Sequence, residues 1–125
     1  MDENISTSNE KILTSIKKLL GIYEENTDFD TDILIHINSV ITILNQLGVG
    51  PTEGFTVDEN TEWSDYISDN SKLNSVKSYI YLKVKMVFDP PMSSAIRDAN
   101  VQMIDELEWR LNLYHESNES NEEEV

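Results

Sequence analysis

The spacing of hydrophobic residues predicts a chain built from helices. Four stretches repeat apolar side chains three and four positions apart, which places them on one face of an α-helix. We expect these helices at about residues 8–20, 29–47, 71–87 and 94–114. The second stretch is rich in β-branched residues, which also suit strands, but its length and period favour a helix. The pattern therefore predicts an all-α fold, a small bundle of about four main helices.

The segment between the second and third helices carries much of the acidic charge. Residues 48–70 contain six acidic residues and no basic one. Within it, we expect a short extended piece at 55–57 and a possible helical turn in the sequence EWSDYI, with Thr61 as its N-cap. The last ten residues hold five glutamates and too little apolar content to fold alone. We therefore expect one domain at 1–115, with a long acidic loop, and a flexible, disordered acidic tail at 116–125.

The third and fourth helices each have apolar residues on more than one side. In the third, one stripe comprises Leu73, Val76, Ile80, Val84 and Val87, and a second comprises Tyr79, Leu82 and Met86. In the fourth, the expected core stripe comprises Ile96, Ala99, Met103, Leu107, Leu111 and Tyr114, and Trp109 and Leu113 lie away from it. Two interpretations stay open: either one core wraps both helices on two sides, or Trp109, Leu113, Tyr79, Leu82 and Met86 meet another subunit.

The sequence FDPP predicts a stiff elbow between these two helices. A residue that precedes proline is disfavoured in the α region, so Asp89 and Pro90 cannot comfortably continue a helix. Pro90 and Pro91 also lack a backbone donor. Ser93 or Ser94 can cap the next helix, and Phe88 is placed to fix the corner. We interpret Phe88–Pro91 as a structural feature.

The net charge of −15 argues against direct binding of DNA or RNA, because the chain would repel phosphates. The bases gather in the third helix, where Lys72 and Lys83 are almost three whole turns apart and share a face. In a head-to-tail ring, they could contact acids of the neighbouring subunit. The candidate acids are Glu53, Asp58, Glu59 and Glu62.

The chain offers no convincing catalytic or metal-binding motif. It has no cysteine. A helical histidine such as His36 is more often a packing residue than a base. The alternating acids of 28–32 lack the glycine and glutamate that complete a calcium loop. Glu106 and Glu108 point in different directions on a helix, and Glu106 suits an i, i+4 pair with Arg110. We expect no enzyme and no cofactor.

The ends and the hydropathy of the chain give no sign of export or membrane insertion. The N-terminal MDENISTSNEKI is acidic and polar, unlike a signal peptide. No apolar run approaches the roughly 18 residues needed to span a bilayer. We therefore expect a protein outside the membrane.

Several segments together resemble the small head–tail connector proteins of tailed phages with long non-contractile tails and of prophages, also called adaptor or head-completion proteins. The segments are FDTDILIHINSVITILNQLGVGP, the later W-S-D-Y, SYIYLKVKMVFDPPMSSA and ELEWRLN. The resemblance runs from about Ile12 to Asn112. Its most specific part is FDPP followed by E-x-E-W-R-L.

This resemblance implies a structural virion protein in the neck, made in the host cytoplasm during assembly. Such subunits form a ring of about a dozen copies beneath the portal protein. The ring extends the DNA channel, lets packaged DNA pass without specific binding, and docks the stopper or tail. The C-terminal part tends to engage the portal in this family, which would make residues 106–125 the portal-facing stretch.

A second hypothesis follows from the charge alone. A small, helical, strongly acidic protein suits a DNA mimic that inhibits a DNA-binding protein. Against this hypothesis, the acids concentrate in the tail and the acidic loop, and the third helix is basic.

Overall fold

The structure is a computed structural model that describes residues 9–123, with side chains as far as Leu113. Its helices are α1 (Ile12–Leu20), α2 (Asp30–Gln46), α3 (Trp63–Tyr66), α4 (Asn70–Phe88) and α5 (Ser94–Glu123). Among the described residues, extended pairing is limited to an isolated bridge between Lys11 and Glu62. The predicted all-α fold is therefore confirmed.

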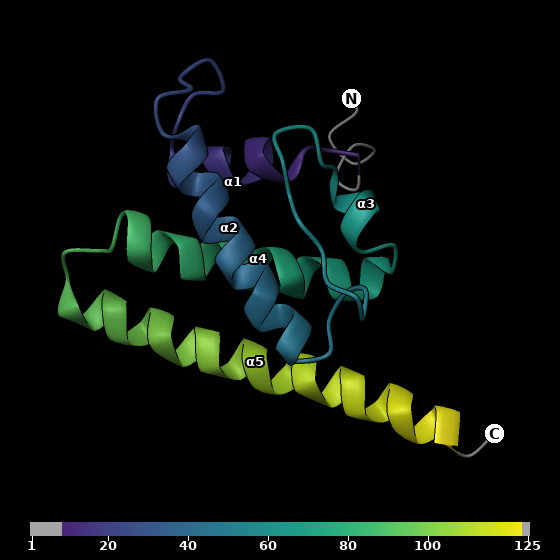
Figure 1. Ribbon diagram of the computed structural model, residues 1–125. Helices are drawn as coiled ribbons and strands as arrows, with labels where there is room; N and C mark the ends of the chain where they lie inside the picture. Colours follow the sequence, from purple (N-terminus) through teal and green to yellow (C-terminus); the bar gives the residue numbers. More distant parts are fainter. Residues whose placement is uncertain (1–8, 124–125) are drawn as a thin grey trace, which may run out of the picture.

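Helix α4 is the centre of the bundle and packs against α1, α2 and α5. Figure 1 shows α2 crossing α4 obliquely, while α5 runs antiparallel along α4 and extends beyond the rest of the bundle. Because α2 and α5 both pack mainly on α4, each also has a face turned away from α4. These two outward faces are separate surfaces of the molecule.

The core forms where the apolar faces of the helices meet the short helix α3. Trp63 is fully buried, and the ammonium group of Lys77 lies 5.2 Å from the centre of its ring. Such a contact between a cation and an aromatic face is stabilising. The largest fully buried side chains are Trp63, Tyr79, Ile12, Ile16, Ile33, Ile37, Ile41, Leu44, Ile80, Leu111, Val76 and Val84.

A buried lysine joins α1 to the start of α2. Gly21 ends α1 with φ 82°, a left-handed conformation that suits glycine. The chain then folds back so that Lys17 donates to the carbonyl of Glu24 at 3.0 Å and pairs with the carboxylate of Asp30 at 2.9 Å. Lys17 is only 3% exposed, so removing Asp30 would leave an unpaired buried charge.

The acidic loop is fastened to α2 by asparagine side chains. Asn38 accepts from the N–H of Val57 at 2.7 Å and donates to the carbonyl of Val57 at 3.0 Å. Asn45 donates to the carbonyl of Pro51 at 2.8 Å. At Gly50, with φ 88°, an added Cβ would lie 2.7 Å from the ring of Tyr66, so a side chain is excluded there. The loop is therefore held to the bundle rather than free in solution.

Two helix starts differ from the sequence prediction. Helix α1 begins at Ile12 rather than near Ser8, because Lys11 is extended and the N–H of Trp63 donates to the carbonyl of Glu10. Helix α3 has Glu62 at its N-cap. The expected cap, Thr61, instead accepts a hydrogen bond from the N–H of Asp58.

Helix α5 ends much later than the sequence analysis placed it. Its backbone is helical to Glu123 rather than to about Tyr114, so it includes most of the segment predicted to be disordered. The chain has no proline or glycine after Pro91, and glutamate is a good helix former. The division into a domain at 1–115 and a tail at 116–125 stays a prediction.

The predicted core stripes needed correction in α4 and α5. Val87 is 64% exposed, because the last turn of α4 extends beyond the point where α2 crosses it (Figure 1). In α5, Ile96, Ala99 and Met103 are exposed, whereas Leu107 and Leu111 are buried together with Ile104, which was not predicted. The side chain of Tyr114 lies outside the described residues. The buried face of α5 thus shares Leu107 and Leu111 with the predicted stripe, and the first half of that stripe is exposed.

Candidate interface surfaces

The elbow between α4 and α5 is held from both sides. The ring of Phe88 packs edge-on against that of Phe29, the residue before α2, with 5.5 Å between ring centres. Asp89 follows with φ −151° and ψ 69°, outside the helical region, and its N–H donates to the carbonyl of Lys85 at 2.8 Å. Helix α5 then starts at Ser94. Residues Phe88–Pro91 therefore determine the direction in which the chain leaves α4.

Arg97 clamps this elbow, a role that the sequence analysis missed. Its guanidinium donates to the carbonyls of Pro91 at 2.7 Å and Met92 at 3.0 Å. Both bonds come from one terminal nitrogen, Nη1, which carries two hydrogens and can therefore donate to two neighbouring carbonyls. An arginine one turn into a helix that follows prolines was the signal available in the sequence.

Tyr79 belongs to the chain's own core, which agrees with the interpretation that one core wraps this helix on two sides. It is fully buried, and its hydroxyl donates to the carboxylate of Glu108 at 2.7 Å. This bond joins α4 to α5. Leu82 and Met86, from the same predicted stripe, are partly buried against the core.

Two buried tyrosines lead us to expect that stability falls at alkaline pH. Burial raises the pKa of Tyr66 and of Tyr79 well above the ordinary value of 10, and the bond to Glu108 adds to the effect at Tyr79. Above pH 10 the unfolded chain releases these protons while the folded chain keeps them. Each tyrosine then lowers the free energy of unfolding by about 1.4 kcal/mol per pH unit. We expect thermal unfolding followed by circular dichroism to show this loss beginning near pH 10.

The matched variant is Tyr79→Phe, which keeps the ring and removes the ionisable group. We expect it to cost about 1 kcal/mol at pH 7, since the bond to Glu108 is lost. That deficit should shrink by pH 11, because at this pH the parent loses stability through the ionisable Tyr79 and the variant does not. An equal deficit at both pH values would show that Tyr79 does not contribute to the alkaline loss.

Trp109 and Leu113 point away from the bundle. Trp109 is 63% exposed and Leu113 is 41% exposed. Each lies two residues, or about 200° around the helix, from the buried Leu111. Their role as anchors for another protein stays a prediction.

Some of the residues predicted to make charge contacts between subunits already have partners within their own chain. Lys83 lies 6.0 Å from the ring centre of Tyr79 and lines a groove of about 290 Å³ between α4 and α5, together with Asp105 and Glu108. The carboxylate of Asp58 accepts from the N–H of Asn60 and the hydroxyl of Thr61, which lowers the pKa of Asp58. Roles of Lys72, Glu53, Glu59 and Glu62 in contacts between subunits stay predictions.

The groups considered for chemistry have structural partners or no suitable neighbours. Asp30 pairs with Lys17, Glu108 accepts from Tyr79, and Glu106 lies 3.8 Å from Arg110. Within residues 9–123, no set of three or more histidine, aspartate or glutamate side chains is arranged to hold a metal ion. Over the same part of the chain, no helix combines the length and the apolar character that a membrane crossing requires. The surfaces left as candidates are the outward faces of the helices.

Comparison with known families gives one result. The model of a family described as "Phage connector protein" matches residues 12–118. This range begins at the first residue of α1 and runs into the last turns of α5, so it includes the elbow and the α4–α5 pair. No curated protein and no solved structure matches the chain.

Proposed function

The chain belongs to the phage connector protein family, and we propose that it is a head–tail connector subunit that forms a ring beneath the portal protein. Membership makes it a structural phage protein that contacts other head and tail proteins. The finer proposal is that the ring extends the DNA channel in the virion neck, and that it docks the stopper or tail. In this proposal, the protein has no enzymatic activity.

The family match over residues 12–118 is the observation that carries this proposal. Two features of the chain support it. The outward face of α5 presents Trp109 and Leu113, a pairing of aromatic and aliphatic groups typical of interface anchors. The net charge of −15 repels phosphates, so a channel built from such subunits lets DNA pass without binding it.

The test is assembly on the portal of the same phage. We expect the purified protein, mixed with purified portal rings, to add a ring-shaped layer that is visible by electron microscopy. The layer should lie on the face of the portal through which DNA leaves. A protein that neither binds portal nor forms rings at high concentration would contradict the proposal.

The alternative of a DNA mimic is supported only by small size, helical content and acidic composition. A mimic would bind a basic DNA-binding protein as a monomer or dimer and would not bind the portal. Family membership instead favours contacts with phage structural proteins. The portal experiment separates the two functions.

A charge-reversal variant tests whether the lysines of α4 contribute to the ring. We expect Lys72→Glu/Lys83→Glu to weaken ring formation by up to about five-fold per contact, since exposed ion pairs contribute about 0–1 kcal/mol. The effect should be largest at low salt, where screening is weakest. Sedimentation at two salt concentrations measures it.

Lys83→Glu alone is the control, because Lys83 also lies beside Asp105 and Glu108 of its own chain. A variant that melts earlier but assembles normally would assign Lys83 to the α4–α5 pair. Equal assembly of the double variant and the parent at both salt concentrations would remove these lysines from the ring contacts.

A further inference from the structure

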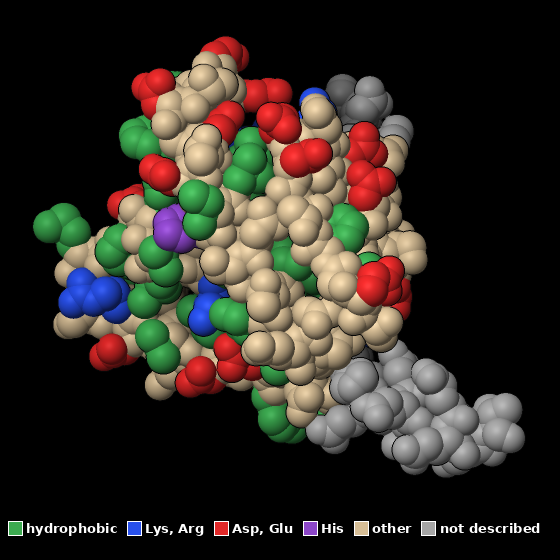
Figure 2. Space-filling model, in the orientation of Figure 1, with side chains coloured by type: hydrophobic (Ala, Val, Ile, Leu, Met, Phe, Trp, Pro, Cys, Tyr) green, Lys and Arg blue, Asp and Glu red, His purple; other side chains and the backbone are tan. Residues whose placement is uncertain are grey.

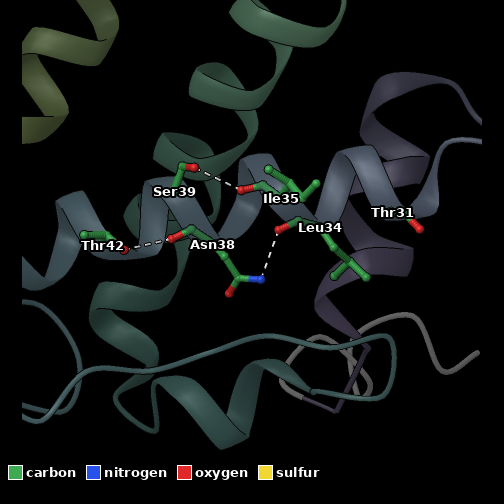
Figure 3. A pocket seen from close by; sticks show the side chains of 6 residues that line it. All are labelled: Thr31, Leu34, Ile35, Asn38, Ser39 and Thr42. Atoms are coloured by element: carbon green, nitrogen blue, oxygen red, sulfur yellow. Dashed lines mark hydrogen bonds between the residues drawn. The ribbon is translucent and has the colours of Figure 1, made fainter.

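The outward face of α2 carries a shallow hollow. It has a volume of about 450 Å³ and is lined by Thr31, Leu34, Ile35, Asn38, Ser39 and Thr42 (Figure 3). Two rows of side chains spaced four residues apart border it, Thr31–Ile35–Ser39 and Leu34–Asn38–Thr42. Ile35 is 58% exposed, although it lies in the middle of a helix. The acidic loop borders the Leu34–Asn38 side of this face through Val57, whereas the side that carries Ile35 and Ser39 is open.

Three polar side chains of this face, Asn38, Ser39 and Thr42, already have partners within the chain. Ser39 donates to the carbonyl of Ile35 at 3.0 Å, and Thr42 donates to that of Asn38 at 3.1 Å (Figure 3). Asn38 donates to the carbonyls of Leu34 and Val57. Covering the face with another protein would therefore leave few polar groups unsatisfied.

The same face lacks charge in a chain that is otherwise highly charged. Between Asp32 and Glu53 the chain has no aspartate, glutamate, lysine or arginine, although its whole net charge is −15. Figure 2 shows acidic side chains along the upper edge of this view and uncharged side chains over the middle of α2. Two copies of the chain repel each other wherever acids meet, and the α2 face avoids that repulsion.

The outward face of α5 has the complementary shape. Trp109 and Leu113 are one turn apart and form a ridge along an i, i+4 row. The face of α2 has a groove between two rows of the same type. A ridge of one helix in such a groove of another is the commonest way in which helices pack, with axes crossing at about 50°.

We propose that the α2 face of one copy receives the Trp109–Leu113 ridge of a second copy. This inference rests on the proposed ring and names the surfaces that join its neighbours. The two surfaces are different and lie on separate sides of the bundle, so the contact is head to tail and can repeat around a ring. Acids beside the ridge, such as Glu106, then face uncharged α2 rather than another acidic surface.

Cross-linking between single-cysteine variants tests the contact, because the chain has no cysteine of its own. Ser39→Cys protein is mixed with Leu113→Cys protein, with and without portal, and treated with a short bis-maleimide. We expect a cross-linked dimer that requires both variants. The control pair is Ser64→Cys with Leu113→Cys, since Ser64 is exposed on α3 and lies away from the hollow. We expect this pair to give several-fold less dimer.

Each outcome separates this contact from the proposed function. Rings on portal without the Ser39–Leu113 cross-link would overturn the contact and leave the function in place. Cross-links confined to pairs of Ser39→Cys chains would also overturn it, because they indicate a symmetric α2–α2 dimer. If the expected cross-link forms but the protein does not bind portal, the result supports the contact and contradicts the proposed function. If neither rings nor cross-links form, both the contact and the proposed function are overturned.

A charge placed in the hollow gives a second measurement. We expect Ser39→Glu to weaken self-association at least about ten-fold, since the new carboxylate would be buried without a partner. Ser64→Glu adds the same charge at an exposed helix position outside the hollow and should have little effect. Both variants should melt at the parent temperature. Unchanged association of Ser39→Glu would contradict the proposed contact.

Discussion

Replacing Trp109 by alanine should weaken docking about thirty-fold, a loss of about 2 kcal/mol, and leave the isolated subunit folded. The side chain is 63% exposed and lies on the face of α5 turned away from α4, so the bundle loses little packing. An aromatic side chain that becomes buried in a partner loses far more when truncated. Thermal melting of the subunit and its binding to portal or to a second copy should be measured together.

Two further variants serve as controls for Trp109→Ala. Tyr23→Ala removes another exposed aromatic, 81% accessible in the loop after α1, and should leave docking unchanged. Deletion of 117–125 should cost less than Trp109→Ala, because that segment has little apolar surface to bury. A Trp109→Ala subunit that melts well below its parent would assign Trp109 to the core of its own chain, and the docking role would fall.

The helices of this chain could be predicted because their apolar positions repeat over many turns. In α2, the buried residues Ile33, Ile37, Ile41 and Leu44 follow the helical period closely. The prolines of the elbow marked the junction between α4 and α5. The family resemblance found in the sequence agrees with the matched family.

The buried face of α5 could be predicted only in part, since Leu107 and Leu111 were expected in the core and Ile104 was not. Apolar residues occur on several sides of this helix, including Ile96, Val101 and Trp109, all of which are exposed. Which of these sides is buried depends on how α5 packs against α4, and helical periodicity alone does not decide between them. The bond from Tyr79 to Glu108 was missed for the same reason, since it joins residues on two different helices.

The role of α2 also lay beyond the sequence analysis. Its uncharged stretch was visible in the sequence, but it reads as a buried helix when only composition is considered. The structure shows that one side of this stretch is exposed, with Ile35, Ser39 and Thr42 on the surface. The helical period indicates the side of α2 that is buried, but only the packing of the rest of the chain shows that the other side is left open.

The elbow should matter more for assembly than for folding. We expect Pro90→Ala/Pro91→Ala to retain the helix content of the parent and to lose about 1–2 kcal/mol in the free energy of unfolding, since each proline restricts the unfolded chain. Residues Asp89 and Pro90 would no longer be barred from the α region, so α4 and α5 could reorient or join. The ring contact that we propose would need one fixed angle between these helices, so we expect ring formation to fail.

Spin labels on α4 and α5 can show whether the angle changes. Cysteines at the exposed Asn74 and Glu106 positions, introduced into the cysteine-free chain, should give one narrow distance in the parent and a broad distribution in the double variant. Pro51→Ala is the matched control, because Pro51 is the remaining proline and lies in the loop after α2. The clamp from Arg97 to Pro91 and Met92 opposes this broadening. Normal rings and an unchanged distance in the double variant would show that Arg97 and the Phe88–Phe29 contact are enough to fix the elbow without the prolines.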